Sequence, residues 1–338
     1  MRGEVTERPP AWMMRQAGRY MAEYRRLANA HPIFRERSET PELVVSISLQ
    51  PFSAFRPDGV IIFSDILTPL PALGADFDIA DSKGPSVPSP IREKHDVDAL
   101  HPIDLDSLSF VHDSLRTLRH EIRGSGAALL GFVGSPWTLA TYLVEGGSTS
   151  VYKVVKSMAL TQPELLHSLL TKLADAIAEY AVSQAHAGAD IVQLFDSWGG
   201  QLPPSMWEAF SLPYNRRVIE YVHKEAPGVP VALYVNGSGG MLERMQKSGA
   251  DVVGLDWTVD MYDARQRLGL SQPVQGNVDP VTLFAGEEIV RQSVHECAQS
   301  AGGTGHVLNL GHGVMVGTPE ENVAAFFDEA KKLDSSSL

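Results

Sequence analysis

Two arginines four residues apart, Arg15 and Arg19, are the side chains of this sequence best suited to bind an anion. They lie in the stretch MMRQAGRY, residues 13–20. The chain has 28 Lys and Arg against 41 Asp and Glu, a net charge of −13, so its overall field does not attract anions. Guanidinium groups bind carboxylates and phosphates in a bidentate manner. The pair predicts a local anion site, with a solvated helix face as the alternative, because residues four apart share one side of a helix.

Two further polar residues, Asp65 and Tyr142, follow apolar runs. Asp65 ends the run 59–64, and a carboxylate in apolar surroundings is costly unless donors converge on it. It therefore either caps the following turn or accepts several N–H donors and faces a developing positive charge. Tyr142 lies about two turns into a helix that we expect to begin with Ser135 as its cap and Pro136 in its first turn. It is either a buried tyrosine with a satisfied hydroxyl or a site residue.

Ser197 and His312 are also candidates. Ser197 does not lie in a G-x-S-x-G elbow, which favours a hydrogen-bonding hydroxyl over a hydrolase nucleophile. His312 lies between two glycines, which let the backbone approach a ligand closely. It is a packed neutral histidine, a ligand contact, or part of a phosphate cradle of the kind found in barrels. Residues 318–321, TPEE, predict a capping box. A metal site is not predicted, because H-E-x-x-H is absent and no other histidine is near His312 at ligand spacing.

The composition restricts the class of protein. Hydrophobic residues make up 43% and charged residues 20% of the chain, as in a soluble globular enzyme. The single cysteine, Cys297, excludes an intramolecular disulfide and a multi-thiolate metal site, and we expect it to be buried in a helix over residues 287–301. No apolar run is long enough to span a bilayer, and no basic patch with interleaved aromatics suggests nucleic acid. The first ten residues show no signal or transit pattern and little lead-in, so we expect an upstream segment to have been removed.

Continuous apolar runs alternate with helical patterns along the chain. Helical patterns include residues 163–186 and 206–225. The apolar runs are residues 11–14, 59–63, 128–133, 191–195, 231–235, 252–255, 273–276 and 306–310. Such runs are typical of buried parallel strands, and eight βα units predict a single distorted (β/α)8 barrel of TIM type over residues 1–338, with its site at the carboxyl ends of the strands. A doubly wound sheet is the alternative, but no G-x-G-x-x-G follows the first run. We expect a loop at 83–90 and a frayed tail at 334–338.

The sequence resembles the uroporphyrinogen decarboxylase family. The matching segments span the chain and are residues 12–24, 59–67, 134–147, 193–197, 254–258, 276–280 and 309–321. The combination of RQAGRY at 15–20 with FSDIL at 63–67 is the most specific part. The segment LDWTVDM at 255–261 resembles variants of photosynthetic lineages. The resemblance therefore implies a soluble protein of the cytoplasm or the plastid stroma.

The resemblance also implies an activity. It implies a cofactor-free and metal-free enzyme of haem and chlorophyll biosynthesis, with a deep cleft and a homodimer whose clefts face each other. The substrate would be uroporphyrinogen III, whose four acetates become methyls, giving coproporphyrinogen III and four CO2. The implied substrate-binding residues are Arg15, Gln16, Ala17, Gly18, Arg19, Asp65, Tyr142, Ser197 and His312. Asp65, Arg15 and Tyr142 are implied to be catalytic.

Within this family Asp65 would accept the pyrrole N–H groups and stabilise the cation formed when a pyrrole carbon is protonated. The proton donor stays open between an arginine and a bound water. Two other functions are alternatives. One is a corrinoid-linked methyltransferase on the same barrel, which would need a zinc site. The other is a non-catalytic tetrapyrrole-binding protein, which would need the arginines but not Asp65.

Overall fold

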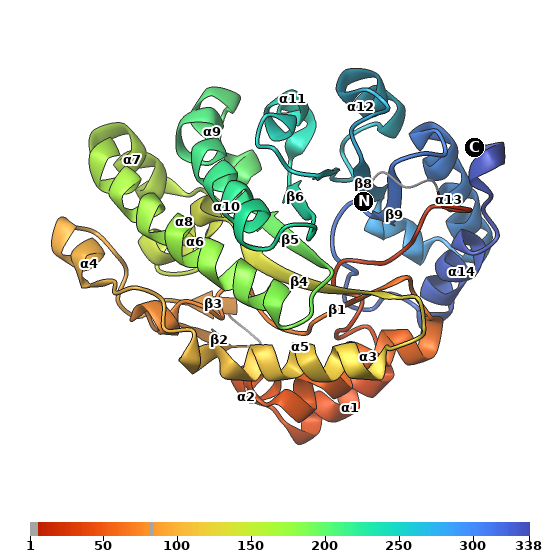
Figure 1. Ribbon diagram of the computed structural model, residues 1–338, viewed down its shortest axis with the longest axis horizontal. Coiled ribbons are helices and arrows are strands. Elements are labelled where there is room, and N and C mark those ends of the chain that lie inside the picture. Colours follow the sequence, from red (N-terminus) through yellow and green to blue (C-terminus); the bar gives the residue numbers. More distant parts are fainter. Residues whose placement is uncertain (1–5, 81–83) are drawn as a thin grey trace.

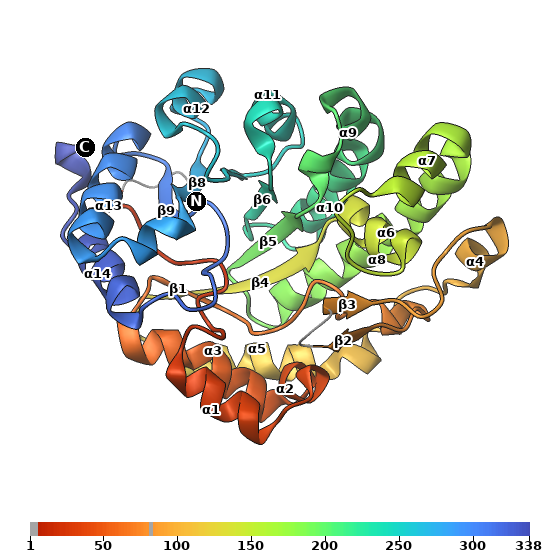
Figure 2. The ribbon, with the colours of Figure 1, turned by 180° about the vertical axis from the view of Figure 1, so that it is seen from behind.

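The computed structural model describes residues 6–80 and 84–338 and shows a curved parallel sheet enclosed by an outer arc of helices (Figures 1 and 2). The strand order is β1-β4-β5-β6-β7-β8-β9, and every neighbouring pair is parallel. The strands are β1 Gly59–Ile61, β4 Ala128–Gly134, β5 Ile191–Asp196, β6 Val231–Val235, β7 Val252–Gly254, β8 Val274–Val278 and β9 His306–Leu310. These seven strands confirm seven of the predicted runs, and their carboxyl ends share one edge of the sheet.

The first predicted run, residues 11–14, does not form a strand. Ala11 makes a single parallel bridge with Leu308 of β9. The backbone N–H of Trp12 donates to the carbonyl of Leu308 at 3.2 Å, and the N–H of Asp58, just before β1, donates to the carbonyl of Ala11 at 2.8 Å. The run therefore contacts both outer strands with too few bonds to count as an eighth. The structure shows an α/β fold with a curled seven-stranded sheet.

The two faces of the sheet carry different clusters of buried side chains. Adjacent residues belong to different clusters, as with Leu129 and Leu130 or Val307 and Leu308, because side chains alternate along a strand. The larger cluster packs the sheet against the helices, and the smaller one includes Trp12. The smaller cluster is bordered by a chain of buried hydrogen bonds. The Trp12 indole donates to Gln275 at 3.0 Å, and the Gln275 amide donates to Gln193 at 2.9 Å. The interior is thus a packed core.

The helices follow the expected alternation. They are α1 Ala22–Ala30, α2 Phe34–Glu39, α3 Pro41–Phe55, α4 Lys94–Ala99, α5 Ser109–Glu121, α6 Pro136–Glu145, α7 Lys153–Thr161, α8 Pro163–His186, α9 Pro204–Phe210, α10 Leu212–Glu225, α11 Leu242–Gln246, α12 Met261–Leu268, α13 Glu287–Ala301 and α14 Glu320–Ala330. The predictions for α8 and α13 are confirmed. The predicted helix 206–225 is broken into α9 and α10, because Pro213 cannot donate the hydrogen bond that would continue α9. No helix in the described ranges is long and apolar enough to cross a membrane.

Three smaller predictions need correction. The capping box at 318–321 is absent: Pro319 precedes α14 without a side-chain cap, and Glu320 accepts the backbone N–H of Ala22 at 2.7 Å instead. Part of the predicted loop 83–90 is β3 Gly84–Ser86, which pairs with β2 Asp78–Ala80. In the predicted frayed tail, residues Ser335–Ser337 form a 3₁₀ turn, and the N–H of Ser335 donates to Glu7 at 2.8 Å. Lys83 and the N-terminal residues 1–5, on which two expectations rest, lie outside the described residues.

Candidate active site at the carboxyl edge of the sheet

The arginine segment forms turns, so the helix-face interpretation of Arg15 and Arg19 is wrong. Arg15 has a φ of 58°, in the left-handed region. Gln16 is fully buried and holds the segment in place: its Nε2 donates to the carbonyl of Gly59 at 2.9 Å, and its Oε1 accepts the N–H of Met13 at 3.2 Å. The Gln16 amide therefore fixes the backbone rather than offering a free group to a ligand.

The two arginine side chains of this segment are exposed. Neither forms a hydrogen bond or a salt bridge through its guanidinium group with any described residue. Ala17 and Gly18 between them are half-buried, and the carbonyl of Gly18 accepts the N–H of Met21 at 3.0 Å. The segment thus presents two cations whose charges are available to a bound anion.

Asp65 is half-buried in the turn that follows β1. Its Oδ1 accepts the backbone N–H of Leu67 at 2.9 Å, so it does cap this turn. Burial raises the pKa of Asp65, while the N–H of Leu67 and the charge of Arg15 oppose that rise. No described residue donates a hydrogen bond to the second oxygen, Oδ2. One carboxylate oxygen is therefore occupied and the other is available to a donor.

Tyr142 lies on α6, which begins as predicted with Ser135 as N-cap, its Oγ accepting the N–H of Thr138 at 3.1 Å. The tyrosine is buried, as the simpler interpretation expected. Burial raises the pKa of Tyr142, the charge of Asp65 adds to the rise, and hydrogen bonding with Trp198 is among the effects that oppose it. Its ring lies 6.1 Å from that of Trp198. Tyr142 is thus a neutral phenol near Asp65.

His312 lies in the loop after β9 and is half-buried. Burial and the charge of Arg15 lower its pKa to about 4, while Asp256 and a hydrogen bond from the N–H of Gly313 oppose the shift. That N–H donates to Nδ1 at 2.7 Å. The other ring nitrogen, Nε2, therefore carries the proton of the neutral imidazole. His312 is a neutral histidine that can donate one hydrogen bond from Nε2.

These positions can be compared with known proteins. The family model for uroporphyrinogen decarboxylase (URO-D) matches residues 1–333. Uroporphyrinogen decarboxylase 1, chloroplastic, of Oryza sativa is 60% identical over 331 residues, covering 98% of this chain and 82% of that protein. Uroporphyrinogen decarboxylase of the cyanobacterium Crocosphaera subtropica is 56% identical, covering 98% of this chain and 94% of that protein. The chain belongs to the uroporphyrinogen decarboxylase family.

A solved structure shares the fold of this family member. A methyltransferase from Methanosarcina mazei superposes with a TM-score of 0.81 at 20% identity, covering 98% of this chain and 96% of the other. A B12-independent methionine synthase from Shewanella matches less well, with a TM-score of 0.56 at 14% identity over 86% of this chain and 85% of that one. At such identities the likeness shows the fold alone.

Some of the sequence-predicted site residues are brought together and others are not. Arg15, Asp65 and Tyr142 influence one another electrostatically, and Arg15 also acts on His312. Ser197 is half-buried in the turn after β5, and no contact links it to that group in the described part of the chain. Arg19 likewise shows no contact with the group. Arg15 is therefore the residue that joins the arginine segment to the other side chains.

Sequence reasoning missed a buried carboxyl group, Asp196, at the end of β5. Its Oδ1 accepts the hydroxyls of Ser135 at 2.7 Å and Thr138 at 3.0 Å. Its Oδ2 accepts the Trp207 indole at 2.8 Å, the Ser211 hydroxyl at 2.6 Å and the Asn215 amide at 3.5 Å. Asp196 thereby holds the start of α6, which carries Tyr142, against β5. Its place at a strand end was the only available signal.

A second buried carboxyl group, Asp256, follows β7 and was also missed as a site residue. Its Oδ2 accepts the N–H groups of Gly237 and Ser238, and its Oδ1 accepts the N–H of Thr258 at 2.9 Å and its hydroxyl at 2.6 Å. The next residue, Trp257, packs edge-on against His312 with ring centroids 5.7 Å apart. Asp256 therefore shapes the loop that supports the histidine.

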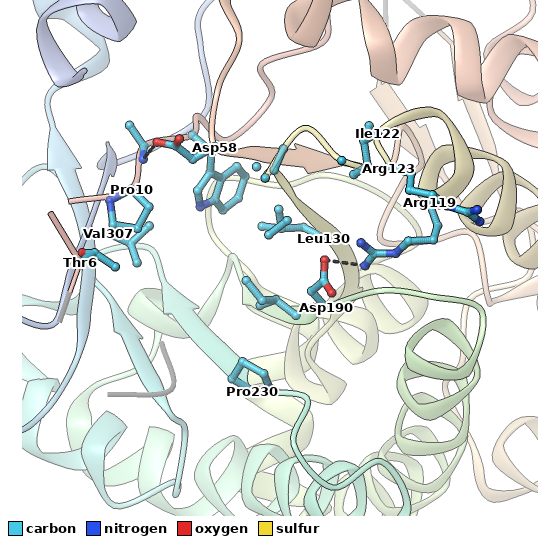
Figure 3. Close-up of a pocket in the computed structure, with 18 residues that line it drawn as sticks. Thr6, Pro10, Asp58, Arg119, Ile122, Arg123, Leu130, Asp190, Pro230 and Val307 are labelled. Atoms are coloured by element: carbon cyan, nitrogen blue, oxygen red, sulfur yellow. Dashed lines mark hydrogen bonds and ion pairs between the residues drawn. The ribbon is translucent and has the colours of Figure 1, made fainter. Parts of the chain in front are cut away.

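A pocket of about 640 Å³ lies at the opposite, amino end of the strands (Figure 3). Its lining includes Trp12, Arg123 and the ion pair between Arg119 and Asp190, 2.5 Å apart. None of the predicted site residues lines it. Active sites of such folds lie at the carboxyl ends of the strands, so this pocket is not assigned to the reaction.

The described ranges contain no group of three His, Cys, Asp or Glu side chains arranged to hold a metal ion. Cys297 lies on α13, as predicted, and is buried. Its Sγ contacts the carbonyl of Gly276 at 3.5 Å, and burial raises the pKa of the thiol to about 11. The cysteine is a protonated core residue.

Proposed function

We propose that this chain is a carboxy-lyase that decarboxylates uroporphyrinogen III, converting its four acetate groups to methyls and yielding coproporphyrinogen III and four CO2. Family membership supports the reaction class. The single observation that carries the assignment of the site is the electrostatic effect of the Arg15 charge on Asp65. A cation without an ion-pair partner in the described structure acts on a half-buried carboxyl group that has one free oxygen.

Loss of CO2 leaves behind the electron pair of the broken C–C bond, and another part of the substrate must accept it. Protonation of a pyrrole carbon creates an iminium-like cation, and the C–C bond to the carboxylate breaks as its electron pair neutralises that cation. The exocyclic carbon then takes a proton to become a methyl, and the ring carbon releases the proton that it took up first, which restores the pyrrole. Each acetate therefore takes up one proton net and releases one CO2. A fixed negative charge next to the pyrrole nitrogen lowers the energy of the cation.

Asp65 would supply that charge. In the free protein, burial raises its pKa. Pyrrole N–H groups that donate to Oδ2 would favour the ionised form and lower the pKa again. Substrate binding would therefore favour the carboxylate form of Asp65, which stabilises the cation.

The remaining predicted residues would hold the substrate. Arg15 and Arg19 would bind side-chain carboxylates, with the backbone of Gln16, Ala17 and Gly18 lining the substrate between them. His312, neutral and protonated at Nε2, would donate to another carboxylate. Tyr142 and Ser197 would contribute hydroxyl groups. Arg15 is also placed in the catalytic step with Tyr142, and the proton comes from an arginine or from a bound water.

We extend the proposal to the architecture. The hydrogen bonds of residues 11 and 12 to β9 and to Asp58 support a single domain that closes as an eight-unit barrel. Membership of the family implies a deep cleft in it. Exposed apolar side chains follow β8 and β9, namely Val281, Phe284, Met315 and Val316, and an interface between two copies would bury them. They support a homodimer with facing clefts. Rice chloroplastic and cyanobacterial relatives support action in the plastid stroma or the cytoplasm.

The test is anaerobic incubation of the protein with uroporphyrinogen, followed by mass analysis of the products. Four successive losses of CO2 are expected, without added cofactor. Tight binding without loss of CO2 would favour the non-catalytic tetrapyrrole-binding protein. Turnover that EDTA abolishes and zinc restores would favour the methyltransferase-like chemistry.

A further inference from the structure

The backbone on both sides of Arg15 is anchored. The N–H of Met14 donates to Oδ1 of Asn309 at 3.0 Å, and the carbonyl of Met14 accepts the N–H of Val314 at 2.9 Å. On the other side, the buried Gln16 amide bonds the backbone of Gly59. The Arg15 backbone is thus tied to the loop after β9 and to β1, and it cannot easily move away from either.

Gly313, in that same loop, lies directly against the aliphatic stem of Arg15. A Cβ atom added to Gly313 would lie 2.7 Å from Cγ of Arg15 and 3.0 Å from its Nε, and closer still to Cδ. Gly313 is not among the glycines with positive φ, so its backbone suits any residue. Glycine is therefore needed here for the space that Arg15 occupies and not for backbone freedom.

We propose that Gly313 is a positioning residue that determines where the Arg15 guanidinium lies relative to Asp65 and His312. Since the backbone of Arg15 is anchored, a side chain at position 313 would have to displace the arginine stem, by roughly 1 Å to restore ordinary contact. Misplacement of this size in an active site costs up to about 10²-fold in rate. The geometric claim stands by itself, and only its consequence for turnover rests on the proposed function.

The clash makes a specific genetic prediction. Gly313→Ala should perturb the site only while the stem of residue 15 is present. In an Arg15→Ala background, Cγ, Cδ and Nε are gone, and the same alanine at 313 has nothing to displace. A general role of Gly313 in folding would instead appear in both backgrounds.

Four proteins are compared: the parent, Gly313→Ala, Arg15→Ala and the double variant. The NMR-measured pKa of His312 is the first readout, because the Arg15 charge helps to lower it and Asp256 and the Gly313 N–H oppose the shift. It should rise in Gly313→Ala relative to the parent, as Arg15 retreats. It should be equal in Arg15→Ala and the double variant. An equal effect of Gly313→Ala in both backgrounds, or no effect in either, overturns the proposal.

Gly239→Ala serves as the matched control, because its added Cβ would have only Val259 as a neighbour, at 4.0 Å. It should keep the parent's His312 pKa and turnover. If Gly313→Ala fails to fold, thermal unfolding decides: recovery of folding in the double variant supports the clash with Arg15, and continued failure contradicts it. Turnover is measured separately and should fall at least about tenfold in Gly313→Ala. A parent without turnover would refute the proposed function, while the NMR comparison would still test the positioning.

Discussion

Replacement of Asp65 by asparagine separates the charge of this residue from its structural role. Among residues 6–80 and 84–338, the one hydrogen bond to its side chain comes from Leu67 N–H to Oδ1, at 2.9 Å. An asparagine carbonyl oxygen can accept that bond, and Asn and Asp are about equal as capping residues. The free energy of unfolding should therefore change by less than about 1 kcal/mol. Because burial raises the pKa of Asp65, loss of the charge at neutral pH should if anything stabilise the fold.

Catalysis should respond very differently. Asparagine has no charge to oppose the substrate cation, and its NH2 group cannot accept from pyrrole N–H groups. Removing one preorganised electrostatic group typically costs about 10²- to 10³-fold in kcat, or about 2.7–4 kcal/mol in activation free energy. We expect a fall in kcat of about 10² or more, with a smaller change in affinity for the substrate. The assay is anaerobic turnover of uroporphyrinogen, with thermal unfolding of the same preparations.

Asp104→Asn is the matched control, because Asp104 makes the same kind of bond to a backbone N–H two residues ahead, at 3.1 Å, on an exposed turn. It should retain the parent's turnover. Near-parental kcat in a folded Asp65→Asn variant would refute the role of Asp65 as the counter-charge. A large loss of stability in that variant would instead show that the turn depends on the carboxylate itself.

Four further outcomes are expected. Arg19→Lys should mainly raise KM, whereas Arg15→Lys should also lower kcat, and both variants should show a weaker salt dependence of substrate affinity when kinetics are measured across a salt series. An unchanged KM and an unchanged salt dependence in both variants would show that these arginines do not bind the substrate carboxylates. Activity should survive exhaustive chelation and dialysis, measured as turnover after EDTA treatment. Folding lowers the pKa of His312 from 6.5 to about 4, so its contribution to stability is full above about pH 6.5 and is lost as pH falls toward 4. When thermal unfolding is measured across this range, the unfolding temperature of His312→Gln should fall less with decreasing pH than that of the parent. Asp196→Asn should lower the free energy of unfolding, measured by denaturant titration, by about 1–3 kcal/mol, because the asparagine NH2 group would face buried donors that now bind a carboxylate oxygen.

The sequence predicted the elements whose signals are local. Seven strands are buried on both faces and read as continuous apolar runs, and α8 and the start of α6 carry recognisable proline and serine signals. Asp65 was identified because it ends such a run, Arg15 and His312 were identified from their neighbouring residues, and the resemblance implied their roles. Each of these depends on neighbouring residues or on a motif that stays intact along the chain.

The features that sequence reasoning missed depend on distant partners. Residues 11–14 look like a strand, but they form only one bridge, between Ala11 and Leu308 of β9, and one backbone hydrogen bond with Asp58 in the described structure. Residues 318–321 looked like a capping box, yet α14 begins without a side-chain cap, and Glu320 of this segment accepts the N–H of Ala22, 298 residues away along the chain. Gln16 was predicted to contact the substrate, and nothing in its neighbouring residues indicated that its amide also holds the loop against Gly59. No local pattern distinguishes these outcomes.

The buried carboxyl groups explain how an acidic protein keeps cations available at its site. Asp196 is satisfied by three hydroxyls, an indole and an amide, and Asp256 by backbone N–H groups and a hydroxyl, so neither draws an arginine inward. An arginine paired with either carboxyl group would be held in the core, because a buried charge left without its partner is costly. Neutral donors perform the structural task instead. Arg15 and Arg19 therefore remain without ion-pair partners in the described structure, and their charges stay available to the polycarboxylate substrate that we propose for this site.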